Sequence, residues 1–129
     1  MFRCVQAALV IGAAVAGISP AMAQVQRNFP ATALRGELVV LQPPEVLLNG
    51  KPARLAPGAR IRDMGNVLVM SGALQKLKLP VNYTLEHHGM LLDIWVLRDD
   101  ERARQPWPRT PAEAQAWAFD PAAQSWTKP

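Results

Sequence analysis

The dipeptide Asn49-Gly50 constrains the fold of this chain more than any other feature, because it interrupts the largely apolar segment 45–55. Asparagine followed by glycine is the preferred sequence of a two-residue β-hairpin turn, whose two positions both need a positive φ. With these residues as the turn, Glu45 faces Arg54 and the two charges are opposite. The sequence therefore predicts an antiparallel hairpin over 45–55.

A second hairpin is predicted around His88-Gly89, since glycine adopts a positive φ freely and histidine does so more readily than most residues. The resulting pairs are Leu85 with Leu92, Tyr83 with Ile94 and Val81 with Val96 on an apolar face, and Thr84 with Asp93 and Asn82 with Trp95 on a mostly polar face. A shift of one residue would mix the two faces. The alternation therefore fixes this register.

Other short segments with strand-like composition are separated by turn residues. They are 36–42, a strand at 59–62 after a turn at Pro57-Gly58, and 65–72, in which Met70 alternates with Leu68 as a core residue would. Together with the two hairpins they predict an all-β domain over 35–98. We expect a small antiparallel OB-like or SH3-like barrel of six to seven strands.

The composition changes after residue 98, and segment 99–129 is a Pro/Trp-rich tail. Thr110 and Glu113 form a capping-box pattern with Pro111 at the first helical position, which predicts one short helix over 111–118. The remainder is expected to be extended. The tail also carries three candidate ligand-binding aromatic residues, which are Trp107, Trp117 and Trp126. They either pack the tail across the barrel or form an exposed surface for a partner or a sugar.

The first residues have the layout of a secretory signal peptide, 1–23. Arg3 gives a positive start, the apolar run 5–18 follows, and 21–23 reads Ala-Met-Ala. The run is shorter than the roughly 20 residues of a membrane-spanning helix, although an uncleaved anchor is the alternative. We expect cleavage near Ala23, a lead-in over 24–34, and a periplasmic or secreted protein without a transmembrane segment.

Cysteine usage and charge exclude several functions. The single cysteine, Cys4, lies inside the predicted signal peptide, so the exported chain has no disulfide, cysteine nucleophile or thiolate metal site. The formal net charge of the full chain is only +4, which falls short of a nucleic-acid-binding signature. We therefore expect no nucleic-acid partner.

Both histidines of the chain, His87 and His88, stand close to Met90. Imidazole and thioether groups bind copper and zinc, and Met64 and Met70 supply further thioethers. However, successive residues of a strand point to opposite faces, so the two histidines share one ion only if the turn is distorted. A periplasmic copper- or zinc-binding protein and a metal-free surface turn are both left open.

Arg54, Arg60 and Arg62 are expected on the solvent side of consecutive strands, with Arg35 and Lys51 nearby. If these strands are adjacent in the sheet, the residues form a positive stripe. Such a stripe could bind an anionic envelope component such as a lipid phosphate or a wall polymer. An envelope protein is the other partner considered. The alternative is an ordinary solvated face.

Catalysis has little support in the sequence. Glu86 and Asp93 are predicted as diagonal neighbours about 7–8 Å apart, and paired carboxylates hydrolyse glycosides. A small glycan-acting hydrolase is therefore a second alternative. There is no nucleophilic serine motif and no phosphate-binding glycine loop. We expect a non-enzymatic binding or structural protein of the envelope that needs no cofactor.

A resemblance supports the same picture. The segments "LRGELVVLQPPEVLLNGKPARLAPGARIRD", "LVMSGAL" and "VNYTLEHHGMLLDIWVL" resemble small exported β-barrel proteins of unknown function from Gram-negative bacteria. The resemblance covers residues 34–97 and implies an OB-like or SH3-like barrel. It implies no catalytic or binding residue.

Overall fold

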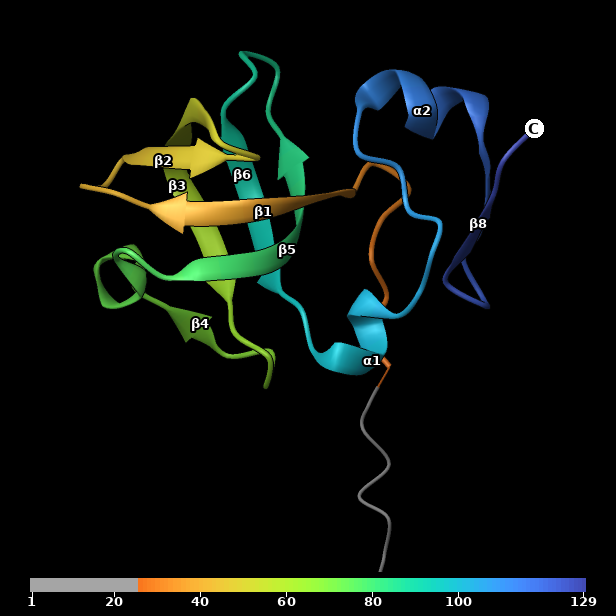
Figure 1. Cartoon of the computed structure of the whole chain (residues 1–129), viewed down its shortest axis with the longest axis horizontal. Coiled ribbons are helices and arrows are strands. Elements are labelled where there is room, and N and C mark those ends of the chain that lie inside the picture. The colour runs from red at the N-terminus through yellow and green to blue at the C-terminus, as the bar shows by residue number, and fades with distance from the viewer. Residues whose placement is uncertain (1–25) are drawn as a thin grey trace, which may run out of the picture.

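The computed structural model describes residues 26–129, which form a β-barrel beside a smaller lobe (Figure 1). We call residues 26–33 and 99–129 the tail lobe. The predicted signal peptide lies outside the described residues. Within 26–129, no helix has the length and apolar character required to cross a membrane.

Five strands close the barrel in the order β1, β2, β3, β6, β5 and back to β1. They are β1 (Leu34–Val40), β2 (Glu45–Leu48), β3 (Lys51–Arg62), β5 (Lys78–Leu85) and β6 (Leu91–Val96). A short strand, β4 (Leu68–Val69), pairs with the end of β3, and a 3₁₀ turn, η1 (Ser71–Leu74), follows it. The predicted all-β barrel is confirmed, with five strands in the closed barrel instead of six or seven.

The barrel is mixed, so the expectation of a wholly antiparallel sheet is wrong. Strands β3 and β6 run parallel, with Ile61 opposite Ile94. The reason is the path of the chain. After β3 it crosses to the far side of the barrel and forms β5 against β1, so that β6 then returns beside β3 in the same direction.

The first predicted hairpin is confirmed. Asn49 has φ 54° and Gly50 has φ 79°, and Glu45 pairs with Arg54 as expected. The turn is also fixed from the neighbouring strand, because the backbone N–H of Glu37 donates to Oδ1 of Asn49 at 2.9 Å. This contact ties the β2–β3 turn to β1.

The predicted turn at Pro57-Gly58 is wrong, because β3 continues through both residues. Gly58 adopts φ 79°, and the pairing of β3 with β6 shifts between Leu55 and Arg60. A glycine with positive φ inside a strand is typical of a β-bulge. The sequence signal therefore marks a bulge within one strand.

The second hairpin has the predicted register along its body and a different one at its tip. Val81 pairs with Val96 and Tyr83 with Ile94 as predicted, but Leu85 pairs with Leu91. Two backbone hydrogen bonds close the tip. The N–H of Glu86 donates to the oxygen of Met90, and the N–H of Gly89 donates to the oxygen of Glu86, both at 2.9 Å. The loop therefore has three residues, and a bulge in β6 absorbs the extra one.

The strand predicted over 65–72 is reduced to the two residues of β4. Met70, expected in the core, is 81% exposed, and Leu68 is 60% exposed. Alternation alone misassigned this segment because only one of its edges pairs with the barrel. Buried residues from all five barrel strands form the core instead, among them Leu38, Val46, Ile61, Val81 and Ile94.

The tail lobe contains more structure than the sequence predicted. Its elements are α1 (Asp99–Arg102), α2 (Pro111–Ala116), β7 (Ala118–Asp120) and β8 (Ser125–Thr127). The predicted helix is confirmed, although it ends two residues early, and Oγ1 of Thr110 accepts from the Glu113 N–H at 3.2 Å. The short β7–β8 hairpin and α1 were not predicted.

A second apolar core holds the tail lobe together and fastens it to the barrel. Its buried members are Phe29, Ala33, Leu97, Trp107 and Trp126. The ring of Phe29 packs edge-on against Trp95 of β6, with centroids 5.4 Å apart. The chain before β1 therefore lies between the barrel and the end of the chain (Figure 1).

Candidate functional site

Arg35 links the barrel to the tail lobe. It lies on β1, where Leu34 and Gly36 face inward and Arg35 faces out. Its Nε donates to Oδ1 of Asn82 on β5 at 3.1 Å. Its Nη atoms donate to the backbone oxygens of Glu101, at 3.0 Å, and Arg104, at 2.6 Å. One oxygen lies in α1 and the other just after it, so Arg35 ties β1 to this part of the tail lobe.

The charge of Arg35 is poorly compensated. Burial lowers its pKa from 12.5 to about 10, Glu101 opposes this shift, and Arg109 and Arg104 add to it. Among the described residues, no carboxylate lies within ion-pair distance of its guanidinium. The Arg35 guanidinium also lies over the ring of Trp107, 4.8 Å from the centroid. An anion placed here would be attracted by several cations at once.

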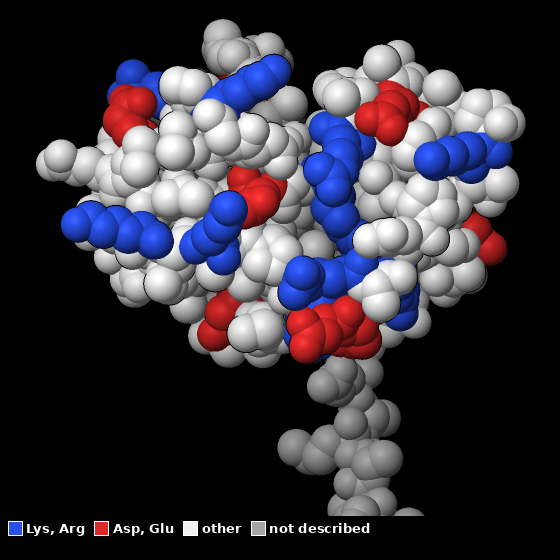
Figure 2. Space-filling view, viewed as in Figure 1, with Lys and Arg blue, Asp and Glu red and all other residues white. Residues whose placement is uncertain are grey.

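Two adjoining cavities open at this point, and both are lined by Arg35, Gln105 and Arg109. The larger, of about 410 Å³, is completed by Gly36, Glu37, Lys78, Pro80 and Arg102. The smaller, of about 230 Å³, is completed by Pro106, Trp107, Glu113, Trp117 and Lys128. We call the two cavities together the basic groove. Figure 2 shows lysine and arginine side chains gathered along the junction between the barrel and the tail lobe.

Few of these cations are neutralised. Lys78 contacts Glu37 at 3.1 Å, and Arg102 makes a longer contact with Asp99 at 3.5 Å. Within residues 26–129, neither Arg109 nor Lys128 has a carboxylate at ion-pair distance. Guanidinium groups bind phosphate and carboxylate with two parallel hydrogen bonds. The basic groove is therefore chemically suited to an anionic ligand.

The arginines proposed from the sequence lie elsewhere. Arg54, Arg60 and Arg62 all belong to β3, so they do not lie on consecutive strands as expected. Arg54 contacts Glu45 at 3.5 Å, while Arg60 and Arg62 approach Oδ1 of Asp93 at 3.1 and 3.5 Å. Each of the three therefore has a carboxylate partner, which reduces the positive potential of the predicted stripe.

The three tryptophans have different environments. Trp107 and Trp126 are each 5% exposed and belong to the second core. Trp117 is partly buried, lines the basic groove and lies beneath Nζ of Lys128, 5.3 Å from the ring centroid. Only Trp117 thus combines an accessible ring with a neighbouring unpaired cation.

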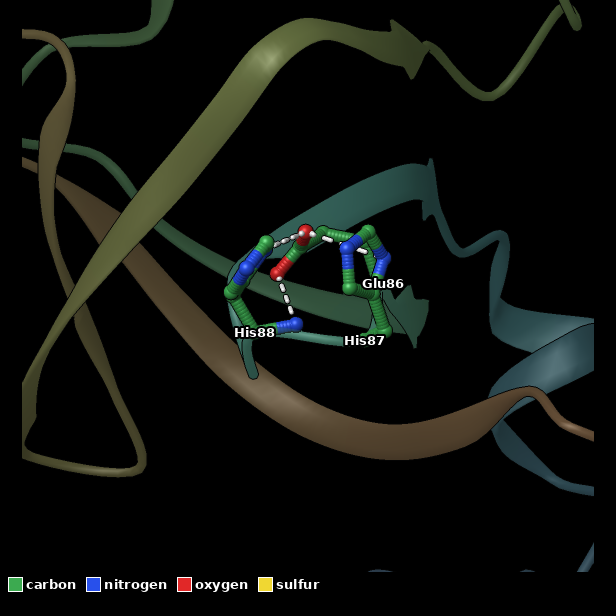
Figure 3. A group of neighbouring side chains, drawn as sticks. All are labelled: Glu86, His87 and His88. Atoms are coloured by element: carbon green, nitrogen blue, oxygen red, sulfur yellow. Dashed lines mark hydrogen bonds and ion pairs between the residues drawn. The ribbon is translucent and has the colours of Figure 1, made fainter.

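The hairpin tip brings Glu86, His87 and His88 together, and one ligand atom of each lies within 4.8 Å of the others. Glu86 lies opposite Met90, because the backbone N–H of Glu86 donates to the backbone oxygen of Met90. Both imidazole rings flank the Glu86 carboxylate (Figure 3).

The carboxylates of the alternative hydrolase are each engaged by other groups. Asp93 contacts Arg60 and Arg62, and Glu86 accepts backbone N–H groups within the turn. The bulge in β6 lies between them and alters the register on which their predicted proximity rested. Neither cavity of the basic groove is lined by Glu86 or Asp93.

Comparison with known proteins finds no matching family model, curated protein or solved structure. The resemblance to small exported barrel proteins therefore stays a prediction. The groove residues Arg109 and Lys128 were missed by sequence reasoning. No sequence pattern relates them to Arg35, because the three are far apart along the chain and meet only when the tail lobe packs on β1.

Proposed function

We propose that this protein is a non-enzymatic binding module that acts outside the cytoplasm and holds a phosphate-bearing ligand in the basic groove. The observation that carries the proposal is the pair Arg35 and Arg109, which line both cavities and have no carboxylate partner among the described residues. Export is supported by the predicted signal peptide at 1–23. It favours an envelope phosphate over a nucleic acid.

The aromatic side of the smaller cavity supports a second property of the ligand, an apolar or ring-shaped portion. Trp117 and Lys128 lie at one side of the smaller cavity, next to Arg109. A ligand that joins a phosphate to an apolar or ring-shaped portion could contact both kinds of surface. The mixture of cations and an aromatic ring therefore supports a phosphorylated organic molecule over a free inorganic ion.

We also infer that the barrel is of the OB type rather than the SH3-like type. The inference is supported by closure through a parallel pair, β3 with β6, and by the long bulged β3 that pairs with both β2 and β6. OB barrels are small Greek-key barrels that carry ligand sites on one face and in adjoining loops. A binding function is common for such a scaffold.

The test is isothermal titration of the purified protein with pyrophosphate at low ionic strength. Arg109→Glu should weaken binding at least about tenfold, the equivalent of one charge-assisted hydrogen bond. Lys51→Glu is the matched control, because it makes the same charge change at an exposed residue outside the groove. Equal losses in the two variants would show that only net charge matters and would contradict the proposed site.

A second experiment distinguishes between two sources of the phosphate, a lipid headgroup and a free phosphorylated molecule. Sedimentation with vesicles of phosphatidylglycerol, compared with phosphatidylcholine, tests a lipid headgroup. If phosphatidylglycerol vesicles bind the protein and Arg109→Glu releases it, the ligand is a lipid phosphate. If only pyrophosphate binds, the groove recognises a free phosphorylated molecule. Binding should weaken with salt in both cases, because the groove is open to solvent.

A further inference from the structure

The tip of the β5–β6 hairpin places one carboxylate oxygen and two imidazole nitrogens within 4.8 Å of one another. Oε2 of Glu86 lies 3.0 Å from Nδ1 of His88 and 3.7 Å from Nδ1 of His87. Around a tetrahedral zinc ion, ligand bonds of about 2.0–2.1 Å place neighbouring donor atoms roughly 3.4 Å apart. The two observed separations lie on either side of this value. We propose that Glu86, His87 and His88 bind a divalent transition-metal ion such as Zn²⁺.

The turn itself holds the carboxylate in place. Oε1 of Glu86 accepts the backbone N–H groups of His88, at 2.7 Å, and Met90, at 2.9 Å. Both hydrogen bonds use the same oxygen, so Oε2 faces the imidazoles. A ligand fixed before the ion arrives loses less conformational freedom on binding.

A hydrogen bond between Nδ1 of His88 and Oε2 of Glu86, at 3.0 Å, orients the His88 ring, and the His87 ring lies beside it. The side chains of His87 and His88 are 84% and 67% exposed, so both are free to point into water. Instead their ring centroids lie 4.0 Å apart and both Nδ1 atoms face Oε2 of Glu86 (Figure 3). Loop residues do not alternate between two faces as strand residues do, so adjacent histidines can share one ion here.

The donor set selects the kind of metal. Two imidazole nitrogens and one carboxylate oxygen suit Zn²⁺, Cu²⁺ and Ni²⁺, whereas Mg²⁺ and Ca²⁺ prefer oxygen alone. The proposed donor set contains only nitrogen and oxygen, whereas the sequence suggested a copper site that includes the Met90 thioether. With three protein ligands, water would complete the coordination of zinc.

The metal site and the basic groove share no residue. Failure of one proposal therefore leaves the other intact.

The test is calorimetric titration of the protein, prepared without a polyhistidine tag, with ZnCl₂ in a non-chelating buffer. One equivalent should bind, and MgCl₂ should give no binding. Loss of a single ligand should weaken the affinity at least about tenfold, since loss of even an outer-shell partner costs 10- to 100-fold. His87→Ala and His88→Ala should each show this effect. Met90→Leu is the matched control and should bind zinc like the original protein.

Glu86→Gln separates coordination from turn structure. The glutamine oxygen can still accept the N–H groups of His88 and Met90, while the anionic ligand is lost. We expect an unchanged melting temperature without metal and at least about tenfold weaker zinc binding. The imidazole signals of the two histidines provide an independent readout, and both should shift together up to one equivalent of zinc. A shift of only one ring, unaltered affinity in either alanine variant, or no zinc binding would overturn the proposal.

Discussion

Arg27 and Glu101 form a buried ion pair that joins the first described residues to α1. Nε of Arg27 donates to Oε2 of Glu101 at 2.8 Å, and Nη2 donates to Oε1. The other Arg27 donors reach the backbone oxygens of Asp63 and Val96, both at 2.8 Å. The Arg98 N–H also donates to Oε1 of Glu101, at 2.9 Å. The pair is therefore well supplied with hydrogen bonds in a region shielded from water.

Removal of one partner should be costly. Arg27→Met would leave the buried Glu101 carboxylate with only a longer contact to Nη2 of Arg98, at 3.6 Å, and we expect a loss of about 3 kcal/mol in the free energy of unfolding. The double variant Arg27→Met/Glu101→Leu should be more stable than Arg27→Met alone, because the poorly compensated buried charge is gone. Urea denaturation, followed by tryptophan fluorescence, measures the free energy of unfolding of both variants. A loss below about 1 kcal/mol, as found for exposed pairs, would contradict this interpretation.

Gly36 is required by close packing and not by its backbone angle. A methyl group at residue 36 would lie 3.0 Å from Cε1 of Tyr83 and 3.1 Å from Oδ1 of Asn49. Gly36→Ala should therefore destabilise the fold by about 1–3 kcal/mol, the usual cost of overpacking. Gly72→Ala is the control, since a methyl group there meets no atom within 4 Å. Thermal unfolding compares the two variants, and equal midpoints would show that the barrel absorbs the methyl group.

Trp107 and Trp126 are equally buried, but only one has a hydrogen-bond partner. Nε1 of Trp107 donates to the backbone oxygen of Ala33 at 3.0 Å, whereas Nε1 of Trp126 has no partner among the described residues. Both phenylalanine substitutions remove the same atoms. Trp107→Phe should cost at least about 1 kcal/mol more, because it leaves a buried oxygen unpaired. Chemical denaturation tests the difference, and equal losses would contradict a stabilising role for the Trp107 hydrogen bond.

Tyr83 is the only tyrosine of the chain, so its ionisation can be followed by ultraviolet absorbance. Burial raises the pKa of its phenol above the ordinary value of 10.0. The folded protein therefore keeps this proton at a pH where the unfolded chain has lost it, and stability should fall as the pH rises above 10. The absorbance change should occur at higher pH in the native protein than in urea. Coincident titrations would mean that Tyr83 is accessible to water.

Local sequence signals predicted the features that depend on a few neighbouring residues. Asn49-Gly50 specified the first hairpin and its register, and Thr110 with Pro111 specified the start of α2. Alternation placed Val81 opposite Val96. These predictions succeed because positive φ, capping and strand alternation are properties of short segments. Where alternation met an unsupported edge strand, as at Met70, the prediction was wrong.

The candidate sites were less accessible to sequence reasoning. The histidines were identified, but the participation of the Glu86 carboxylate, which lies opposite Met90 because of the bulge in β6, was not. The groove needs β1 and the tail lobe to meet, which depends on Phe29, Trp107 and their neighbours burying a shared apolar surface.

The sequence by itself thus determined the Asn49-Gly50 turn, the start of α2 and a small β-barrel. Tertiary structure decided the parallel pairing of β3 with β6 and the meeting of Arg35 with Arg109. The physical reason is the separation along the chain between the residues that interact. A turn is stabilised by the φ and ψ preferences of adjacent residues, whereas contacts between distant residues form only when apolar packing repays the entropy of closing the chain between them.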